Sequence, residues 1–203
     1  MTGSTKLAAG LLPQDWYFRD VVEVARDLVG RYIRRGPVVL RITEVEAYRG
    51  PDDSAAHTSM GRTPRNEPMW GDGGHSYVYL CYGLHNMLNV VTGRGEGTAV
   101  LIRSAEPVEG EALVRARRGG KSGPVLLTGP GKLGQALDLS TEWSGHRLFM
   151  PGGLELLEGE PARRLLAGPR VGIDYAKPKD VRARLRFADA DSEWVSMRSR
   201  LRP

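Results

Sequence analysis

The stretch from Val38 to Tyr48 constrains the fold of this chain more than any other part of its sequence. Polar and apolar residues alternate through it with the two-residue period of a β-strand. Strict alternation would place five residues on one face, namely Leu40, Ile42, Glu44, Glu46 and Tyr48. This face begins apolar and ends in two carboxylates and a tyrosine. The two carboxylates either pair with nearby arginines such as Arg41 or Arg49, or supply a general base or metal ligands.

Other segments show the periods of both helices and strands. Helical spacing predicts helices over 20–31, 107–118 and 132–139, and strand patterns cover 77–82, 87–92, 98–104 and 182–188. The strands at 77–82 and 87–92 form a hairpin with its tip at 82–86, and a long loop covers 50–74. Helices and strands do not alternate as in βαβ units, so we expect an α+β fold. Its core would be a curved mixed or antiparallel β-sheet with flanking helices and a projecting β-hairpin. One domain would span 1–203, with 1–15 loosely ordered.

Charge and cysteine content narrow the class of protein. The chain has 29 Lys and Arg residues against 24 Asp and Glu, a net charge of +5, and arginine greatly outnumbers lysine. Because the planar guanidinium matches phosphate groups, this balance favours a nucleic-acid partner. The single cysteine, Cys81, excludes an internal disulfide framework and a cysteine-based zinc site. No apolar run approaches the roughly 20 residues that span a bilayer. The apolar stretch at 7–12 is too short for a signal peptide. We therefore expect a cytoplasmic protein with no membrane partner.

Three tyrosines and one histidine near the predicted hairpin are candidate binding residues. Tyr77 and Tyr79 share a strand face, whereas Tyr82 stands at the hairpin tip. Tyrosine is common on half-buried sheets, and it can also stack a nucleobase with a gain of roughly 1–3 kcal/mol. His57 lies in the long loop, where a histidine is either solvent-exposed without a functional role or catalytic. Its acidic neighbours at 52 and 53 lack the i,i+4 spacing of a helical zinc motif.

A series of short motifs runs in order through residues 20–196. They are TEVEAY (43–48), GPDD with AAH (50–57), GRTPRN (61–66), YVY (77–79), YG (82–83), LIR with EP (101–107), GP with KL (129–133), and WVS (194–196). Each piece is weak alone, but the combination resembles the alkyladenine (3-methyladenine) DNA glycosylases of the mammalian type, which also occur in bacteria. The resemblance implies a bacterial member of that family.

This resemblance implies an activity and its partners. Such an enzyme flips an alkylated or deaminated purine out of double-stranded DNA. It then hydrolyses the N-glycosidic bond and leaves an abasic site for base excision repair. The expected enzyme is a monomer that uses no cofactor and no metal. No lysine lies on a motif strand, so a water-using, monofunctional glycosylase is expected rather than one that forms a Schiff base and cleaves the strand.

The resemblance also assigns roles to individual residues. Glu46 would activate the water, which Arg103 and the backbone carbonyl of Val195 help to hold. The residues assigned to the base pocket are Tyr48, Ala55, His57, Tyr79 and Asn89. The side chains of Tyr48, His57 and Tyr79 would stack the base, and the backbone at Ala55 and His57 would read its edge. Asn89 would crowd the exocyclic amino group of guanine. Tyr82 would fill the gap in the duplex. Arg62, Arg65 and Lys132 would contact DNA phosphates.

Two other functions are compatible with the same residues. A metal-dependent nuclease or phosphoesterase could use the carboxylates of Glu44, Glu46, Asp52 and Asp53 with His57. A non-catalytic nucleic-acid-binding module could use the tyrosine hairpin to stack bases, with Glu46 merely paired. Glu44 gains no catalytic role from the resemblance and is expected to be structural. At the hairpin tip GLHN (83–86), relatives often carry larger apolar or aromatic residues at one or more positions, so the resemblance does not fix the efficiency or the damage preference of this chain.

Overall fold

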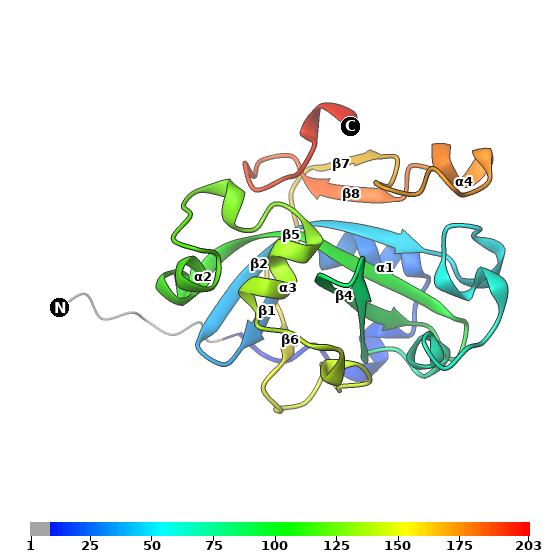
Figure 1. Ribbon diagram of the computed structural model, residues 1–203, viewed down its shortest axis with the longest axis horizontal. Coiled ribbons are helices and arrows are strands. Elements are labelled where there is room, and N and C mark those ends of the chain that lie inside the picture. Colours follow the sequence, from blue (N-terminus) through cyan, green and yellow to red (C-terminus); the bar gives the residue numbers. More distant parts are fainter. Residues whose placement is uncertain (1–8) are drawn as a thin grey trace.

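One curved antiparallel sheet organises the computed structural model, which describes residues 9–203 (Figure 1). The strands are β1 Tyr32–Arg35, β2 Val38–Tyr48, β3 Ser76–Cys81, β4 His85–Thr92, β5 Thr98–Glu109, β6 Glu155–Leu157, β7 Leu165–Gly168 and β8 Arg186–Asp189. Their order is β3-β4-β5-β2-β1-β6, with β8 added to β2 and β7 added to β8. The prediction of a single α+β domain with a curved sheet, flanking helices and a hairpin is confirmed.

β2 lies at the centre of this sheet. It pairs with β5 along one edge, while its other edge pairs first with β1 and then with β8. Its predicted bounds are confirmed, but the predicted single face is wrong. Leu40 and Ile42 enter the main apolar core, and so do Val45 and Ala47. The register with β5 shifts on both sides of Glu44. This bulge moves the core-facing positions from even to odd numbers, as one extra residue must in a strand.

Within residues 9–203, four α-helices flank the sheet. They are α1 Val21–Leu28, α2 Glu111–Arg117, α3 Pro130–Ala136 and α4 Pro178–Arg182. The carboxylate of Asp20 caps α1 by accepting from the backbone N–H groups of the first turn, and the apolar face of α1 packs on β2 and β5. α3 packs on β4 and β5. Figure 1 shows α4 together with β7 and β8 at the top of the molecule.

Several predicted boundaries differ from the structure. The helix expected over 20–31 ends at Leu28, and the helix expected over 132–139 runs from Pro130 to Ala136. Residues 107–109 continue β5 rather than starting a helix, because they pair with the beginning of β2. The strand ends at Gly110, whose φ of +75° breaks the extended chain, and a Cβ there would lie 2.6 Å from the carbonyl oxygen of Pro37. The strand predicted at 182–188 is shorter and begins later: α4 takes up Arg182, and β8 runs only from Arg186 to Asp189. The short strands β1, β6 and β7 were not predicted.

The predicted hairpin is formed by β3 and β4, and α3 supports it. The side-chain amide of Asn86 donates to the carbonyl of Leu139 over 2.6 Å. Gly134 allows α3 to approach β4 closely, since a Cβ at this position would lie 2.0 Å from the carbonyl oxygen of Asn86. At the tip, Tyr82 and Gly83 have φ values of +51° and +68°. The backbone N–H of Leu84 closes the turn on the carbonyl of Cys81.

The predicted loose segment at 1–15 falls outside the described residues as far as residue 8. From residue 9 onward the chain contacts the sheet: Leu12 is buried, and its N–H donates to the carbonyl of Leu156. Among the helices of residues 9–203, none is both long and apolar enough to cross a membrane.

Candidate functional site

A cavity of about 550 Å³ opens on the side of the sheet away from the main core. Alternate residues of four strands line it: Tyr48 from β2; Tyr77, Tyr79 and Cys81 from β3; Met87 and Asn89 from β4; Leu101 and Arg103 from β5. The 50–74 loop adds Ala55, His57, Arg65 and Met69. Val171, Gly172, Ile173 and Tyr175 line a further part of it. This volume is typical of a site for a small organic ligand or a single nucleobase.

Glu46 lies fully buried behind this cavity. It belongs to a row of directly paired strand residues that runs through Tyr77, Asn89 and Leu101. The backbone N–H of Val171 donates to Oε1 over 2.8 Å, and the hydroxyl of Tyr48 donates to Oε2 over 3.0 Å. Nη1 of Arg103 lies 3.2 Å from Oε1. Burial and the negative charge of Glu46 hold the pKa of Tyr48 well above its usual value. Tyr48 therefore remains a hydrogen-bond donor at neutral pH.

The two carboxylates of β2 do pair with arginines, although not with those expected. Arg103 reaches both of them, since its Nε donates to Glu44 over 2.9 Å. Arg186 also donates to Glu44. The expected partners face elsewhere: Arg41 pairs with Glu106 and Asp189, and Arg49 pairs with Asp180.

His57 and two tyrosines form an aromatic wall. Nδ1 of His57 and the hydroxyl of Tyr77 share a hydrogen bond of 2.8 Å, and the rings of His57 and Tyr79 are 4.5 Å apart. Burial, followed by the positive charge of Arg65, lowers the pKa of His57 below its usual 6.5. The imidazole is therefore neutral at physiological pH. The Arg65 guanidinium lies 5.5 Å from the centre of the Tyr79 ring, at the rim of the cavity.

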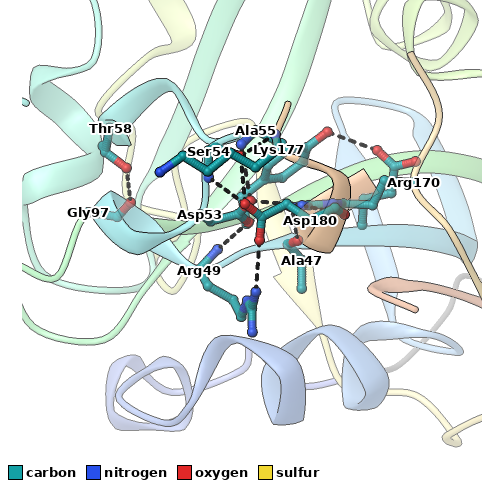
Figure 2. A network of polar contacts seen from close by, with 12 residues as sticks. Ala47, Arg49, Asp53, Ser54, Ala55, Thr58, Gly97, Arg170, Lys177 and Asp180 are labelled. Carbon is teal, nitrogen blue, oxygen red and sulfur yellow. Dashed lines mark hydrogen bonds and ion pairs between the residues drawn. The ribbon is translucent and has the colours of Figure 1, made fainter. Parts of the chain in front are cut away.

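The segment following β7 contributes residues that the sequence patterns did not indicate. Figure 2 shows how Arg170 connects this segment to the 50–74 loop. Its two terminal nitrogens donate to the two oxygens of Asp53 over 2.5 and 2.8 Å, and Nη1 also donates to the carbonyl of Ala47. The guanidinium lies 4.7 Å from the ring centre of Tyr48. Arg170 thus fixes the ring of Tyr48 and places the Val171 N–H beside Glu46.

Asp53 and Asp180 complete this network (Figure 2). Burial alone would raise the pKa of Asp53, but hydrogen bonds and charge from Arg170, with backbone N–H groups of Arg49 and Ala55, hold it below 3.8. Asp180 accepts from the side chain of Arg49 and from both the backbone N–H and the hydroxyl of Ser54. No periodic pattern marks Arg170, and its partner Asp53 is 117 positions away, so sequence periodicity could not have paired them.

The structure brings most of the expected site residues together. Tyr48, Ala55, His57, Arg65, Tyr79, Tyr82, Asn89 and Arg103 all line the cavity. The amide of Asn89 is oriented by donation to the carbonyl of Tyr77 over 3.0 Å. The backbone N–H of Ala55 donates to Asp53, and its carbonyl accepts from the hydroxyl of Tyr175.

The side chains of three expected residues lie outside the cavity lining. That of Val195 packs against Ala188 and Leu201, whereas the backbone on either side of it is hydrogen-bonded to Thr43 and Glu44 of β2. Arg62 is exposed and paired with Glu67. Lys132 lies on α3, where burial and the neighbouring charges of Arg118 and Lys121 lower its pKa.

The carboxylates required for the nuclease alternative do not converge. Glu44 is engaged by Arg103 and Arg186, and Asp53 by Arg170. Across residues 9–203 there is no group of three His, Cys, Asp or Glu side chains that could hold a metal ion. This arrangement gives no support to the proposal that these five residues form a metal site.

Comparison with known proteins places this geometry in a family. Residues 15–193 match the methylpurine-DNA glycosylase (MPG) family. A DNA-3-methyladenine glycosylase of Arabidopsis thaliana is 58% identical over 189 residues, which cover 92% of this chain and 74% of that protein. A protein of Nitrosococcus oceani, provisionally named 3-methyladenine DNA glycosylase, is 57% identical over 194 residues, covering 95% and 96% of the two chains. A protein of Methanocella arvoryzae with the same provisional name is 43% identical over 195 residues, covering 93% and 97%. This chain therefore belongs to the methylpurine-DNA glycosylase family.

Proposed function

We propose that this protein is a monofunctional DNA glycosylase that releases alkylated or deaminated purines from double-stranded DNA by hydrolysis. The observation that carries the proposal is the buried carboxylate of Glu46. Its three partners, Tyr48, Arg103 and Val171, all line an aromatic cavity of about 550 Å³. A reactive carboxylate is thus placed directly behind a pocket that can accept one purine.

The cavity suits a damaged base that has left the duplex. Flipping costs a few kcal/mol, and this cost is lowest for a base that is already damaged or mispaired. The rings of Tyr48, His57 and Tyr79 offer stacking surfaces, and an alkylated purine is cationic, so aromatic faces attract it further. Because the pKa of His57 is lowered, its neutral imidazole adds no repulsion toward such a cation.

Hydrolysis would proceed on a water molecule held beside Glu46. The carboxylate accepts a proton from the water, the oxygen bonds to the sugar C1′, and the base leaves with the electrons of the broken N-glycosidic bond. A positioned carboxylate contributes roughly 10²–10⁴-fold to such a step. Arg103 and the carbonyl of Val195 would orient the water. No cofactor enters this reaction, and its product is an abasic site.

The DNA would lie across the mouth of the cavity. Tyr82, which is 90% exposed at the hairpin tip, would occupy the gap left by the flipped nucleotide. Arg65, which lines the cavity, and Arg62 and Lys132, which do not, would contact phosphates. One chain supplies every proposed group, so we expect the enzyme to act as a monomer.

A single assay tests this function against its alternatives. The protein is incubated in excess EDTA with duplexes that carry one hypoxanthine or one alkylated adenine, and half of each sample is then treated with alkali. A glycosylase yields a strand break only after alkali. A parallel sample contains no EDTA. Strand breakage before alkali in that sample alone would indicate a nuclease. Binding of the duplex without base release would indicate a binding module.

Glu46→Gln provides the matched variant. It should bind the damaged duplex as the wild type does but release the base in a single turnover only at a residual rate, roughly 10²–10⁴-fold below that of the wild type. Normal release by this variant would refute the assignment of Glu46 as the base.

A further inference from the structure

Glu44 stands at the bulge of β2, two residues before the proposed general base, and the cavity does not expose it. We infer that Glu44 is a positioning residue that holds two of the groups proposed to orient the water, Arg103 and the Val195 carbonyl. This inference rests on the proposed function. It assigns a role to a side chain that the family resemblance left as merely structural.

The carboxylate of Glu44 is completely buried and accepts five hydrogen bonds. Oε1 accepts from Nε of Arg103 over 2.9 Å, from Nη1 of Arg186 over 3.2 Å and from the hydroxyl of Ser196 over 2.8 Å. Oε2 accepts from the hydroxyl of Ser104 over 2.8 Å and from the backbone N–H of Ser196 over 2.7 Å. One carboxylate therefore links β2, β5, β8 and the segment after β8.

The first consequence concerns Arg103. A guanidinium is planar, so an acceptor on Nε fixes the direction of both terminal nitrogens. With Nε held by Glu44, Nη1 lies 3.2 Å from Glu46. Arg103 is itself a residue that the bulge skips in the pairing of β5 with β2. Its direction toward Glu46 consequently depends on Glu44 rather than on regular strand geometry.

The second consequence concerns Val195. The residue after it is bound to Glu44 through both its backbone and its side chain. The residue before it, Trp194, accepts at its carbonyl from the hydroxyl of Thr43 over 2.5 Å. Two adjacent bulge residues, Thr43 and Glu44, thus hold the chain on either side of Val195. The orientation of its carbonyl is set by the same bulge that directs Arg103.

A glutamine at position 44 cannot serve both groups. If its amide oxygen faces Arg103 and Arg186, its NH₂ group meets the N–H of Ser196, and the opposite orientation places NH₂ against the two arginines. Glu44→Gln keeps the volume of the side chain but must release one set of partners. A misplacement of about 1 Å at a reacting group can cost on the order of 10²-fold in rate.

The test compares this variant with two serine variants on a hypoxanthine duplex. Glu44→Gln should lower the single-turnover rate of base release about 10²-fold. Its affinity for the damaged duplex should stay within about twofold of wild type. Ser196→Ala, which removes one hydrogen bond from the Val195 segment, should lower the rate about fivefold. Ser104→Ala is the matched control. It also removes one donor to Glu44, but the lost hydroxyl bonds neither the Arg103 guanidinium nor the Val195 segment, so the wild-type rate should be kept.

A double variant separates positioning from stability. If Glu44 acts only through the water at Glu46, then Glu44→Gln with Glu46→Gln should be no slower than Glu46→Gln alone. A purely structural role predicts instead that the two losses add, that affinity falls with rate, or that Ser104→Ala is as slow as Ser196→Ala. Any of these results overturns the inference, as does a wild-type rate in Glu44→Gln.

A spectroscopic measurement tests the positioning role of Glu44 without relying on base release. In ¹⁵N NMR of the folded wild type, the Nε–H of Arg103 and the amide of Ser196 should be protected from exchange, and Glu44→Gln should expose at least one of them. If the wild type releases no base, the proposed function fails by itself, and unchanged protection would separately refute the positioning role. If Glu44→Gln does not fold, the contrast between Ser196→Ala and Ser104→Ala decides.

Discussion

Replacement of Tyr82 by glycine should stabilise the protein while impairing its proposed function. The backbone of Tyr82 is held at a φ of +51°, in the left-handed region, and its side chain is 90% exposed. A residue with a Cβ pays roughly 1–2 kcal/mol for this conformation. Glycine avoids that cost but adds about 0.5–1 kcal/mol of unfolded-state entropy. The balance is a net gain of about 0.5–1 kcal/mol, or about 1–4 °C in melting temperature for a chain of this size.

The functional effect should have the opposite sign. Stacking of an aromatic side chain on a base contributes about 1–3 kcal/mol, so loss of the ring should weaken binding to a damaged duplex about 5–150-fold. Binding is measured by fluorescence anisotropy in a Glu46→Gln background, in which base release is slow. Stability is measured by thermal unfolding monitored with circular dichroism.

Tyr82→Ala is the control that separates ring from backbone. Alanine also lacks the ring but keeps the Cβ in the left-handed region. The free energy of unfolding of Tyr82→Ala should therefore stay within about 0.5 kcal/mol of the wild-type value, and its melting temperature should change little. Its affinity loss should equal that of Tyr82→Gly. The reasoning is refuted if Tyr82→Gly melts several degrees below Tyr82→Ala, or if both variants bind the damaged duplex as tightly as the wild type.

Three further perturbations test other parts of the molecule. Asp53→Asn leaves the Arg170 charge buried without its carboxylate and should cost about 3–5 kcal/mol at neutral pH. Because the folded pKa of Asp53 lies below 3.8, this difference from wild type should shrink as the pH falls below about 4, in urea titrations at several pH values. Gly134→Ala places a Cβ 2.0 Å from a β4 carbonyl oxygen and should cost about 1–3 kcal/mol, whereas Gly71→Ala, with 3.4 Å of space, should be nearly neutral. Lys132→Ala should reduce the slope of log affinity against log salt by about 1, and an unchanged slope would remove this residue from the DNA-binding surface.

Sequence periodicity located the strands in which buried and exposed residues alternate over a long enough stretch. The bounds of β2 agree with the prediction, and both strands of the hairpin are close to theirs. Periodicity could not locate β1, β6 and β7, because three or four residues are too few to show a period. Nor could it show the bulge at Glu44, since a change of face depends on which partner residues β5 and β8 supply.

The same limit applies to the site. The motifs indicated most of the cavity lining, because those residues lie on strands and on one loop with recognisable spacing. They did not indicate Arg170 or Tyr175, whose importance arises from contacts with Asp53 and Ala55 more than a hundred positions away. Glu44 illustrates the point most clearly. Its residue type and position were evident in the sequence, yet its five hydrogen-bond donors belong to four residues in three other parts of the chain.

The buried charges around Glu46 are better explained by function than by stability. Glu44, Glu46 and Arg186 are completely buried, and Arg103 is nearly so. Removing such charges from water costs several kcal/mol per ion, and well-packed apolar residues often replace buried ion pairs without loss of stability. A fold that needed only a stable sheet could therefore use apolar side chains at these positions. Hydrophobic contacts, however, have no fixed direction, whereas a carboxylate with five donors holds its neighbours at defined angles. Directional control of Arg103 and of the chain around Val195 is what hydrolysis at Glu46 would require.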